Sequence, residues 1–404
     1  MAKIAVLGYG VVGSGVVELF YKNKDKITKK AGKEADIKYI LDIRDFSDSP
    51  YSSKFTKTID DILNDDEVTI VAECMGGATF AYDFVKACLE KGKSVSTSNK
   101  ELVAVKGAEL LRIAKKNNCN FFFEASVGGA IPIIRPLHKC LAANDITQIC
   151  GILNGTTNFI LGKMINESMD FKAALKMAQE LGYAEKDPTA DVEGIDACRK
   201  ICILSSLAFG KHVYPESVFT KGISDVSLED VKYAGMFGGS VKLIASVERT
   251  EDGKIIPMVM PMIVPFDNML SRVDDVFNAV LVCGDGIDKA MFYGRGAGKL
   301  PTASAVLGDV IEEIKNEGET DIAQTWEDSS DASFISDYKN KKCRMYFRVS
   351  GVDVASLKNV TVVSSESDVV FVTEKMTISA ADAYEKELTG KGAMVKSRLA
   401  VLDV

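Results

Sequence analysis

The chain has 404 residues, 47% of them hydrophobic and 26% charged, and its formal net charge is −8. This length and composition predict a globular protein of two or three domains with a substantial core. The sequence has no basic block suited to a nucleic-acid backbone and no apolar run of about 18 residues, which argues against nucleic-acid binding and against a membrane span.

Cysteine and histidine usage favours a reducing compartment. The nine cysteines, an odd number, include no C-x-x-C motif, and only His138 and His212 offer imidazole ligands. The first residues, AKIAVLGYG, are typical of a strand that enters a glycine turn and lack the features of a signal peptide. We therefore expect free thiols, no zinc site and a cytoplasmic location.

The first 125 residues alternate apolar, strand-like runs with amphipathic helical stretches. Helices are expected at 11–23, 78–92 and 105–118, and strands at 4–8, 37–41, 68–74, 94–97 and 120–126. This alternation predicts a Rossmann-type, doubly wound parallel sheet with helices on both faces. The lysine-rich stretch 22–30 is expected to be a solvated helix face or loop.

The pattern changes after about residue 136. Helices are expected at 158–182, 194–210 and 301–317, and strands at 255–264 and 277–284. These elements predict an α+β domain over 136–317 that follows a nucleotide-binding domain over 1–135, with the helix 301–317 packing back toward the first domain. Residues 318–341 are polar and indicate a linker, and the short strands of 342–404 predict a small α+β module.

The sequence G-Y-G-V-V-G directly follows the first strand and opens a helix. Gly8 permits a tight turn, Gly10 allows a pyrophosphate to approach the backbone, and Gly13 allows the helix to pack closely on the strand. In its place on the first strand of an alternating α/β domain, the motif predicts a dinucleotide site, and the alternative is a tight turn without a ligand.

The end of the second strand carries two residues that favour different cofactors. Asp42 would bind the adenosine ribose of NAD, whereas Arg44 would bind the 2′-phosphate of NADP. Asp42 follows the glycines by about 30 residues, more than the usual ~20, and the lysine-rich insertion accounts for the difference. The sequence leaves the preference open.

Three further segments follow strand ends or precede helices. Lys100, after Asn99, can polarise a carbonyl oxygen or exchange a proton with it, although a lysine in this position is more often a surface residue. The glycines of EASVGGAIPII (124–134) can expose carbonyls to a ligand or a monovalent cation, or form a plain crossing loop. In GILNGTTNFIL (151–161), Asn154 or Thr156 can cap a helix whose free N–H groups could receive a carboxylate.

The segment ELGYAEKDPTADVEGIDACRK (180–200) carries six carboxylates and leads into an apolar helix. Asp196 and Lys200 are four residues apart, so they share one face of that helix. A loop can carry several such charges without a function, and on a surface such a pair contributes little, but at the start of a buried helix the pair is also a candidate for a functional role. The glycine-rich GRGAGKLPTASAV (294–306) can close over a cofactor or form a flexible turn.

Together these segments resemble the motifs of homoserine dehydrogenase, in the same order, across roughly residues 1–317. The motifs are GYGVVG, SNKELVA, EASVGGAIPII, GILNGTTNFIL, GYAEKDPTADVEGIDACRK and GRGAGKLPTASAV. The resemblance implies an oxidoreductase that interconverts L-aspartate 4-semialdehyde and L-homoserine with NAD or NADP, in the biosynthesis of threonine, methionine and isoleucine. It also implies that the second domain pairs two subunits, so that the protein is a homodimer or homotetramer.

The resemblance assigns roles residue by residue. The cofactor-binding set comprises Gly8, Gly10, Val11, Val12, Gly13, Arg44, Lys100, Gly296 and Gly298. The substrate-binding set comprises Gly155, Thr156, Tyr183, Glu185, Asp191, Asp196 and Lys200, of which Lys200 and Asp196, with Lys100, form the catalytic group. A sodium-type site, mostly of main-chain carbonyls, is implied at Glu124, Val127, Gly129 and Ile131.

The chemistry of the reaction agrees with these residue types. Reduction of an aldehyde develops negative charge on its oxygen, and Lys100 and Lys200 can supply positive charge and a proton. Asp196 would hold Lys200, while Glu185 and Asp191 suit the ammonium group of the substrate. The sequence does not decide which lysine is the formal acid or base.

The C-terminal residues 342–404 resemble an ACT-type regulatory module, with one departure. GVDVASLKN has no glycine after Asp353, where the family has a turn, and the module is short by a strand or helix. Threonine feedback is therefore open, and subunit contact is the alternative role.

Two rival functions make different demands on the sequence. A dinucleotide sensor without turnover would not need Lys100, Asp196 and Lys200, and all three are present. An acylating semialdehyde dehydrogenase needs a cysteine with a histidine partner, and Cys74 and His138 do not stand in such motifs.

Overall fold

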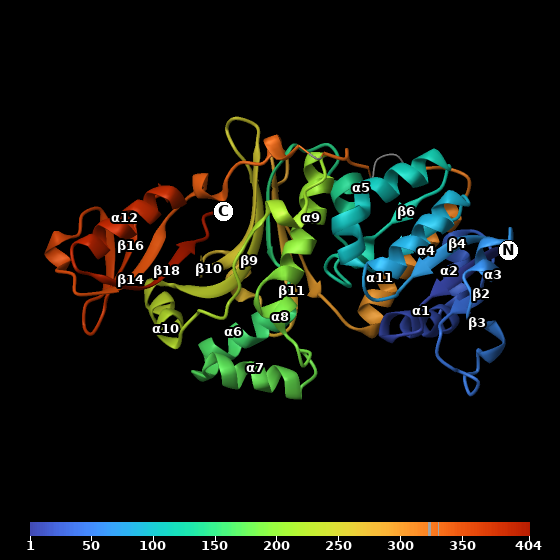
Figure 1. The fold of residues 1–404 in the computed structure, drawn as a ribbon, viewed down its shortest axis with the longest axis horizontal. Coiled ribbons are helices and arrows are strands. Elements are labelled where there is room, and N and C mark those ends of the chain that lie inside the picture. Colours follow the sequence, from blue (N-terminus) through green and yellow to red (C-terminus); the bar gives the residue numbers. More distant parts are fainter. Residues whose placement is uncertain (322–324, 330) are drawn as a thin grey trace.

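In the computed structural model, which describes residues 1–321, 325–329 and 331–404, the chain is elongated. Strands and helices from the first 122 residues lie at one end, the C-terminal strands lie at the other, and a large sheet stands between them (Figure 1). Among these residues no helix is both long and apolar enough to cross a bilayer.

The N-terminal sheet is parallel throughout. Its order is β3-β2-β1-β4-β5-β6, which is the order of a doubly wound nucleotide-binding sheet. Its strands are β1 (Ala2–Leu7), β2 (Ala35–Leu41), β3 (Phe55–Thr56), β4 (Val68–Glu73), β5 (Ser94–Thr97) and β6 (Phe121–Phe122). The strand order reverses between β1 and β4, which places a ligand crevice at the carboxyl ends of these two strands.

Helices cover both faces of this sheet. One face carries α3 (Asp60–Leu63), α4 (Thr79–Glu90) and α5 (Lys100–Lys116), and the other carries α1 (Val11–Lys22), α2 (Lys24–Ala31) and α11 (Lys299–Lys315). The lysine-rich stretch forms most of α2, which buries Ile27 and Ala31 and exposes most of its lysines. The late helix α11 returns to pack beside α1, where a Cβ on Gly15 would lie 2.8 Å from the carbonyl oxygen of Lys299.

A mixed sheet forms the middle of the molecule. It contains β7 (Ile146–Ile152), β9 (Gly239–Arg249), β10 (Ile255–Pro265), β11 (Phe277–Gly284) and β12 (Asp288–Arg295), and β8 (Phe219–Thr220) pairs with β10. The helices beside it are α6 (Gly155–Glu167), α7 (Phe171–Glu180), α8 (Thr189–Val192), α9 (Ile195–Phe209) and α10 (Leu228–Phe237). The α+β character that the sequence indicates for this region is confirmed.

The single long helix expected at 158–182 is wrong, because the chain breaks there into α6 and α7. Ser168 adopts the left-handed conformation with φ of 52° and ends α6. Asp170 then caps α7 by accepting a hydrogen bond from the backbone N–H of Ala173 at 2.9 Å. The break turns α7 away from the sheet and leaves the first turn of α6 beside the residues near 191–200.

The C-terminal strands extend the central sheet. Residues Met262 and Ile263 of β10 pair in parallel with Ala400 and Val401 of β18, so that one ten-stranded sheet runs through both regions among the described residues. The added elements are β14 (Met345–Ser350), β15 (Val360–Ser364), β16 (Val369–Thr373), α12 (Ile378–Gly390) and β18 (Met394–Val401), beside the short pair β13 (Lys342–Cys343) and β17 (Met376–Thr377). Between β14 and β15 the chain makes only a 3₁₀ turn, Val354–Ser356.

The polar segment before these strands is anchored by Trp326. Its indole Nε1 donates to Nδ1 of His212 at 2.8 Å, and its ring packs edge-on against Phe123. A Cβ on Gly107 of α5 would lie 2.8 Å from the same ring. The indole is therefore held between α5 and the chain that follows α9.

Candidate active site

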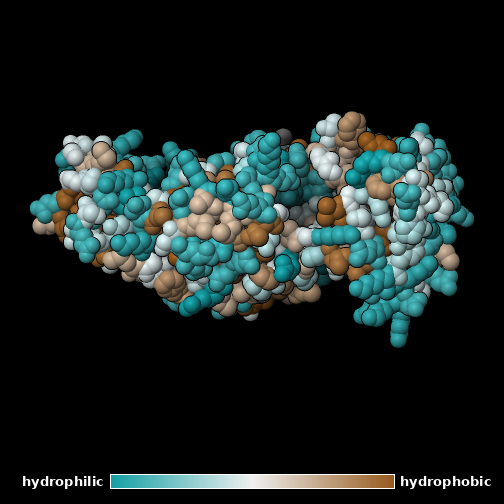
Figure 2. Space-filling view, turned by 90° about the horizontal axis from the view of Figure 1, so that it is seen from below, coloured by the Kyte–Doolittle hydropathy of each residue, from teal (hydrophilic) through white to brown (hydrophobic). Residues whose placement is uncertain are grey.

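A cavity of about 570 Å³ lies between the N-terminal sheet and the central sheet. Viewed from below, the molecule is notched between the end formed by residues 1–122 and its middle (Figure 2). Most of the candidate residues line this cavity: Val11, Val12, Lys100, Gly129, Gly155, Thr156, Tyr183, Glu185, Asp191, Asp196, Lys200, Gly296 and Gly298. Outside its lining lie Gly8, Gly10, Gly13, Arg44, Glu124, Val127 and Ile131.

The glycine turn has the shape of a phosphate cradle. Gly8 follows β1 with φ of +88°, and a Cβ on Gly13 would lie only 1.8 Å from the carbonyl oxygen of Gly8. In contrast, a Cβ on Gly10 would meet nothing within 4 Å, so the space above it is open. The first turn of α1 begins at Val11 and presents its free N–H groups to that space. The residues present therefore fit the pyrophosphate of a dinucleotide.

At the end of β2, Asp42 is held by the glycine turn and by Arg44. Its Oδ2 accepts from the backbone N–H of Tyr9 at 2.8 Å and from Arg44, and its Oδ1 accepts from the backbone N–H and Nε of Arg44, both at 3.0 Å. The hydrogen bond from the Arg44 side chain lowers the pKa of Asp42 to about 2. Arg44 itself is 57% exposed and stacks on Phe46, so it would reach a ligand by exchanging its side-chain hydrogen bonds with Asp42.

Asp196 stands between the two lysines. Its Oδ1 lies 2.5 Å from Nζ of Lys100, and its Oδ2 accepts from Nζ of Lys200 at 2.7 Å. Lys200 also donates to the carbonyl oxygen of Leu153 at 2.6 Å. The side chain of Lys100 is 41% exposed, whereas those of Asp196 and Lys200 are 6% and 9% exposed. A half-exposed cation and a buried one therefore share one carboxylate.

Two helices, α5 and α9, produce this geometry. Lys100 is the first residue of α5, whose N-cap, Asn99, accepts from the backbone N–H of Leu102 and donates to the carbonyl oxygen of Gly77. Asp196 and Lys200 lie one turn apart on α9, which packs against α5. The contact between the two helices brings residues 100 and 200 to one point of the cavity.

The environment separates the two lysines electrostatically. Burial, together with the charge of Lys100, lowers the pKa of Lys200 in spite of the attraction of Asp196. Burial is also the largest single effect on Lys100, but the charge and the hydrogen bond of Asp196, with the charge of Asp191, together outweigh it and raise the pKa of Lys100. The two cations hold the pKa of Asp196 well below its usual range, although burial opposes them. Lys200 is the lysine more easily deprotonated.

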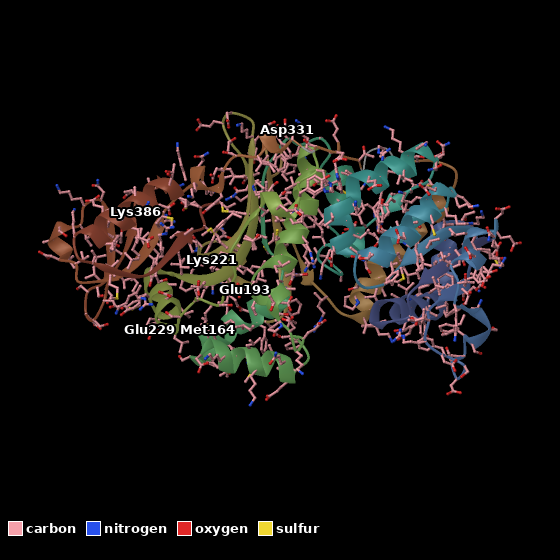
Figure 3. The ribbon with its side chains drawn as sticks, in the orientation of Figure 1. Met164, Glu193, Lys221, Glu229, Asp331 and Lys386 are labelled. Atoms are coloured by element: carbon pink, nitrogen blue, oxygen red, sulfur yellow. The ribbon has the colours of Figure 1, made fainter. Side chains whose placement is uncertain are left out.

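The remaining polar groups surround this centre. Asn154 donates to Oδ1 of Asp191 at 2.7 Å and to Oδ2 of Asp196 at 2.9 Å. Thr156 donates to the carbonyl oxygen of Tyr183 at 2.6 Å, which holds the chain around Glu185 at the mouth of the cavity. Glu193, labelled in Figure 3, lies at the turn between α8 and α9 and accepts from Ser224, so it belongs to the scaffold.

The glycine-rich loop before α11 closes one side of the cavity. The backbone N–H of Ala130 donates to the carbonyl oxygen of Arg295 at 3.1 Å. A Cβ on Gly129 would lie 2.5 Å from the carbonyl oxygen of Gly296, and a Cβ on Gly296 would lie 2.1 Å from Nδ2 of Asn278. Gly129 is therefore required by close packing of the main chain, and Gly296 by the side chain of Asn278.

One of the residues considered for a monovalent cation, Glu124, is a buried acid. The carboxylate of Glu124 accepts from the backbone N–H groups of Ile133, Ile134 and Arg135 at 2.6 to 2.9 Å. The carbonyl oxygens in question belong to Glu124, Val127, Gly129 and Ile131. In the part of the chain that the structure describes, none of them accepts a backbone hydrogen bond other than those within helices and strands. Carbonyl oxygens are ligands that a hard cation would take, whereas over the same part of the chain no cluster of histidine, cysteine and acidic residues suits a transition metal.

Two polar residues of the cavity, Asn154 and Asn278, are among those that the sequence did not identify as site residues. Asn154 was visible only as a helix cap, because its contacts to Asp191 and Asp196 cross 37 and 42 residues. Asn278 lies inside an otherwise apolar strand, is 1% exposed and lines the cavity. A polar residue at a buried strand position is the pattern that would have drawn attention to it.

A wider groove of about 950 Å³ lies elsewhere, between β11 and the C-terminal strands. It contains Lys289, and Arg344 and Lys375 pair there with Asp403, but it holds no buried acid–lysine pair. The chemistry is therefore concentrated in the smaller cavity.

Comparisons with known proteins agree on one family. The family profile described as "Homoserine dehydrogenase, NAD binding domain" matches residues 8–124, and the one described as "Homoserine dehydrogenase" matches residues 132–311. A homoserine dehydrogenase of Bacillus subtilis (strain 168) is 43% identical over 319 residues, which are 78% of this chain and 73% of that protein. One of Lactococcus lactis subsp. lactis (strain IL1403) is 38% identical over 87% of this chain and 83% of its own length.

Solved structures give the same result. The crystal structure of a homoserine dehydrogenase from Thiobacillus denitrificans matches with a TM-score of 0.90 at 32% identity, over 99% of this chain and 98% of that chain. A hyperthermophilic archaeal homoserine dehydrogenase in complex with NADPH matches with a TM-score of 0.66 at 29% identity, over 77% of this chain and 97% of that chain.

Proposed function

This chain belongs to the homoserine dehydrogenase family, and on that premise we propose that its central cavity interconverts L-aspartate 4-semialdehyde and L-homoserine with NAD or NADP. The observation that carries the proposal is the carboxylate of Asp196 between the ammonium groups of Lys100 and Lys200, beside the glycine turn. A buried acid flanked by two lysines suits a reaction in which charge develops on one oxygen.

The protein residues divide the work of substrate binding and proton transfer. The bound cofactor supplies or accepts the hydride. Asp191 and Glu185 take the ammonium group of the amino acid, and the first turn of α6, at Gly155 and Thr156, takes its carboxylate. Lys100 remains cationic and stabilises negative charge on the reacting oxygen. Lys200, whose pKa burial lowers, gives a proton to that oxygen in reduction and removes it in oxidation.

This division predicts a shift of the pH profile when the charge at position 100 is removed. In homoserine oxidation Lys200 must be neutral, so kcat/KM rises as the pH passes through its pKa. The positive charge of Lys100 helps to lower that pKa. In Lys100→Met, the rising limb of the profile is therefore expected to move to higher pH, and the rate to fall because the oxygen loses its cation. A limb that moved to lower pH would contradict the assignment of the base.

We propose that Arg44 gives the enzyme its affinity for NADP, while Asp42 allows it to use NAD. Arg44 is exposed and can leave Asp42 for a 2′-phosphate, and Asp42 stands where an acid binds the adenosine ribose. Removal of one charged hydrogen-bonding partner costs about 1.5–3 kcal/mol, so Arg44→Ala is expected to raise KM for NADP by about 10- to 100-fold. KM for NAD, measured in parallel, is expected to change less than threefold. Equal losses with both cofactors would refute this role.

We also propose a sodium-type ion at the carbonyl oxygens of Glu124, Val127, Gly129 and Ile131. The support is that all four belong to a buried segment next to the glycine-rich loop, as the hydrogen bond from Ala130 to Arg295 indicates. The ion would fix the shape of that segment. Activity in sodium compared with a bulky organic cation at equal ionic strength tests the proposal.

For the chain as a whole we propose a cytoplasmic homodimer or homotetramer with an ACT-like module at its C-terminus. The domains would be 1–135 for the cofactor, 136–317 for substrate binding and subunit contact, 318–341 as linker and 342–404 as the module. Nine cysteines without a disulfide suit a reducing compartment, and the order β18-β14-β16-β15 with α12 resembles an ACT module that lacks its first helix. Sedimentation, and activity with added threonine, test these assignments.

The activity itself is tested by homoserine-dependent reduction of NAD and NADP, followed at the absorbance of the reduced cofactor. Turnover with at least one cofactor is expected for the wild-type protein. A folded protein that binds the cofactor but turns over homoserine with neither would favour the dinucleotide sensor.

A further inference from the structure

Asn154 is the N-cap of α6 and lies between two acids of the cavity. We propose that Asn154 is a positioning residue, whose carboxamide fixes Asp191 and Asp196 so that one acid faces the substrate and the other faces the two lysines. The inference rests on the roles proposed above for those two acids. It gives Asn154 a function in the reaction beyond the cap.

The side chain of Asn154 uses all of its hydrogen-bonding groups. Its Nδ2 donates to Oδ1 of Asp191 at 2.7 Å and to Oδ2 of Asp196 at 2.9 Å. Its Oδ1 accepts from the backbone N–H of Thr157 at 2.8 Å and from the Thr157 hydroxyl at 3.0 Å. The residue is 5% exposed. A buried carboxamide with every group satisfied has one orientation, so it can serve as a rigid bracket.

The bracket sets which oxygen of Asp196 faces which lysine. Oδ2 receives Nδ2 of Asn154 and Nζ of Lys200, which leaves Oδ1 for Lys100. Without Asn154, the carboxylate could rotate and exchange its two oxygens between the lysines. Orientation of this kind matters because small displacements in a reacting centre lower rates strongly.

The bracket also holds two carboxylates together without adding a cation. Burial raises the pKa of Asp191, the nearby charge of Asp196 raises it further, and the hydrogen bond from Asn154 lowers it. The other charged groups that act on Asp191 are Lys200 and Lys100, which also lower its pKa. Loss of Asn154 is therefore expected to raise the pKa of Asp191 and to make its ionised form rarer in mildly acidic solution.

A capping role alone makes a different prediction. The N-cap function needs only an acceptor for the N–H of Thr157, which serine or aspartate also supplies. The bracket needs two donors, which neither residue has. Asn154→Ser therefore separates the two functions, while Asn154→Asp retains the cap and places a third carboxylate against the other two.

The test measures homoserine oxidation as a function of pH for Asn154→Ser, Asn154→Ala and Asn154→Asp. Asn154→Ser is expected to keep a thermal midpoint near that of the wild-type protein, to lower kcat/KM for homoserine by about 10- to 100-fold, and to move the acid limb of the homoserine KM profile to higher pH. Asn154→Asp is expected to lose the most activity, because like charges would face each other in a buried site.

The matched control is Asp170→Ala, which removes the cap of α7 without touching the cavity acids. It is expected to lower thermal stability and to leave both kcat/KM and the acid limb unchanged. If Asn154→Ser matches the wild-type protein in kcat/KM and in the acid limb, Asn154 is a cap only and the inference is wrong.

A further variant distinguishes this failure from a failure of the proposed function. Asp191→Asn is expected to raise KM for homoserine strongly, since it removes the charge that faces the ammonium group. If Asp191→Asn has no such effect, the proposed substrate site itself is wrong. If it has the effect and Asn154→Ser does not, only the role of Asn154 is refuted.

Discussion

Replacement of Lys200 by methionine is expected to lower kcat for homoserine oxidation by about 10²- to 10⁴-fold, the usual contribution of a general acid or base. The substitution removes the ammonium group that contacts Asp196 and the carbonyl oxygen of Leu153. Asp196 keeps Lys100 as a partner, so no buried charge is left alone, and methionine fills the space of the lysine stem. The variant is therefore expected to fold, and KM for the cofactor is expected to change little.

The matched control is Lys386→Met. Lys386 is exposed on α12, at the end of the molecule formed by the C-terminal strands, whereas the cavity lies between the N-terminal and central sheets (Figure 3). Its replacement should leave kcat and both KM values unchanged. A folded Lys200→Met protein with wild-type kcat would remove Lys200 from proton transfer and would favour Lys100 as the acid or base. Single-turnover measurements would then locate the affected step.

Replacement of Gly13 by alanine is expected to weaken NADP binding by about 100-fold or more, the equivalent of two lost hydrogen bonds to a charged group. The new Cβ would lie 1.8 Å from the carbonyl oxygen of Gly8 and 3.0 Å from its carbonyl carbon. Both are main-chain atoms, so the strand and the helix must move apart and the turn must open. Titration of the protein with NADPH, followed by ligand fluorescence, measures the loss.

Gly235→Ala is the matched control for this substitution. Gly235 lies in α10, is exposed, and a Cβ there would meet nothing within 4 Å. The exchange should leave NADPH affinity unchanged and raise stability slightly, because alanine favours a helix over glycine. Unchanged NADPH affinity in Gly13→Ala would show that the turn does not shape the pyrophosphate site.

The parts of the fold with local signals could be predicted from the sequence. The parallel N-terminal sheet follows from alternating apolar strands and amphipathic helices, and α9 from the largely apolar stretch 201–209 that comes after Asp196 and Lys200. The break between α6 and α7 depends on Ser168 and Asp170, a left-handed residue and a cap inside a run of good helix formers. The summed helix propensity of residues 158–182 favours one continuous helix. The signal from Ser168 and Asp170 is too small to outweigh that sum.

The candidate site likewise contains residues whose position has a local sequence signal and residues that only the tertiary fold brings together. The glycine turn carries its geometry in its own residues, so its position was predictable. Lys100 taken alone resembles a surface lysine, and only the packing of α5 on α9 brings it to Asp196. The bonds from Asn154 to Asp191 and Asp196 and the pairing of β10 with β18 join residues far apart in the chain, for which one sequence offers no periodic signal.

The position of Trp326 gives the protein an optical property. It is the chain's single tryptophan, so all indole emission comes from one place. Its ring is 7% exposed and touches both α5, the helix that begins with Lys100, and the segment after α9, the helix that carries Lys200. A change in the spacing of these helices when ligands enter the cavity would alter the surroundings of the indole. The unlabelled enzyme thus carries a native fluorophore between α5 and the segment that follows α9, the helices that carry Lys100 and Lys200.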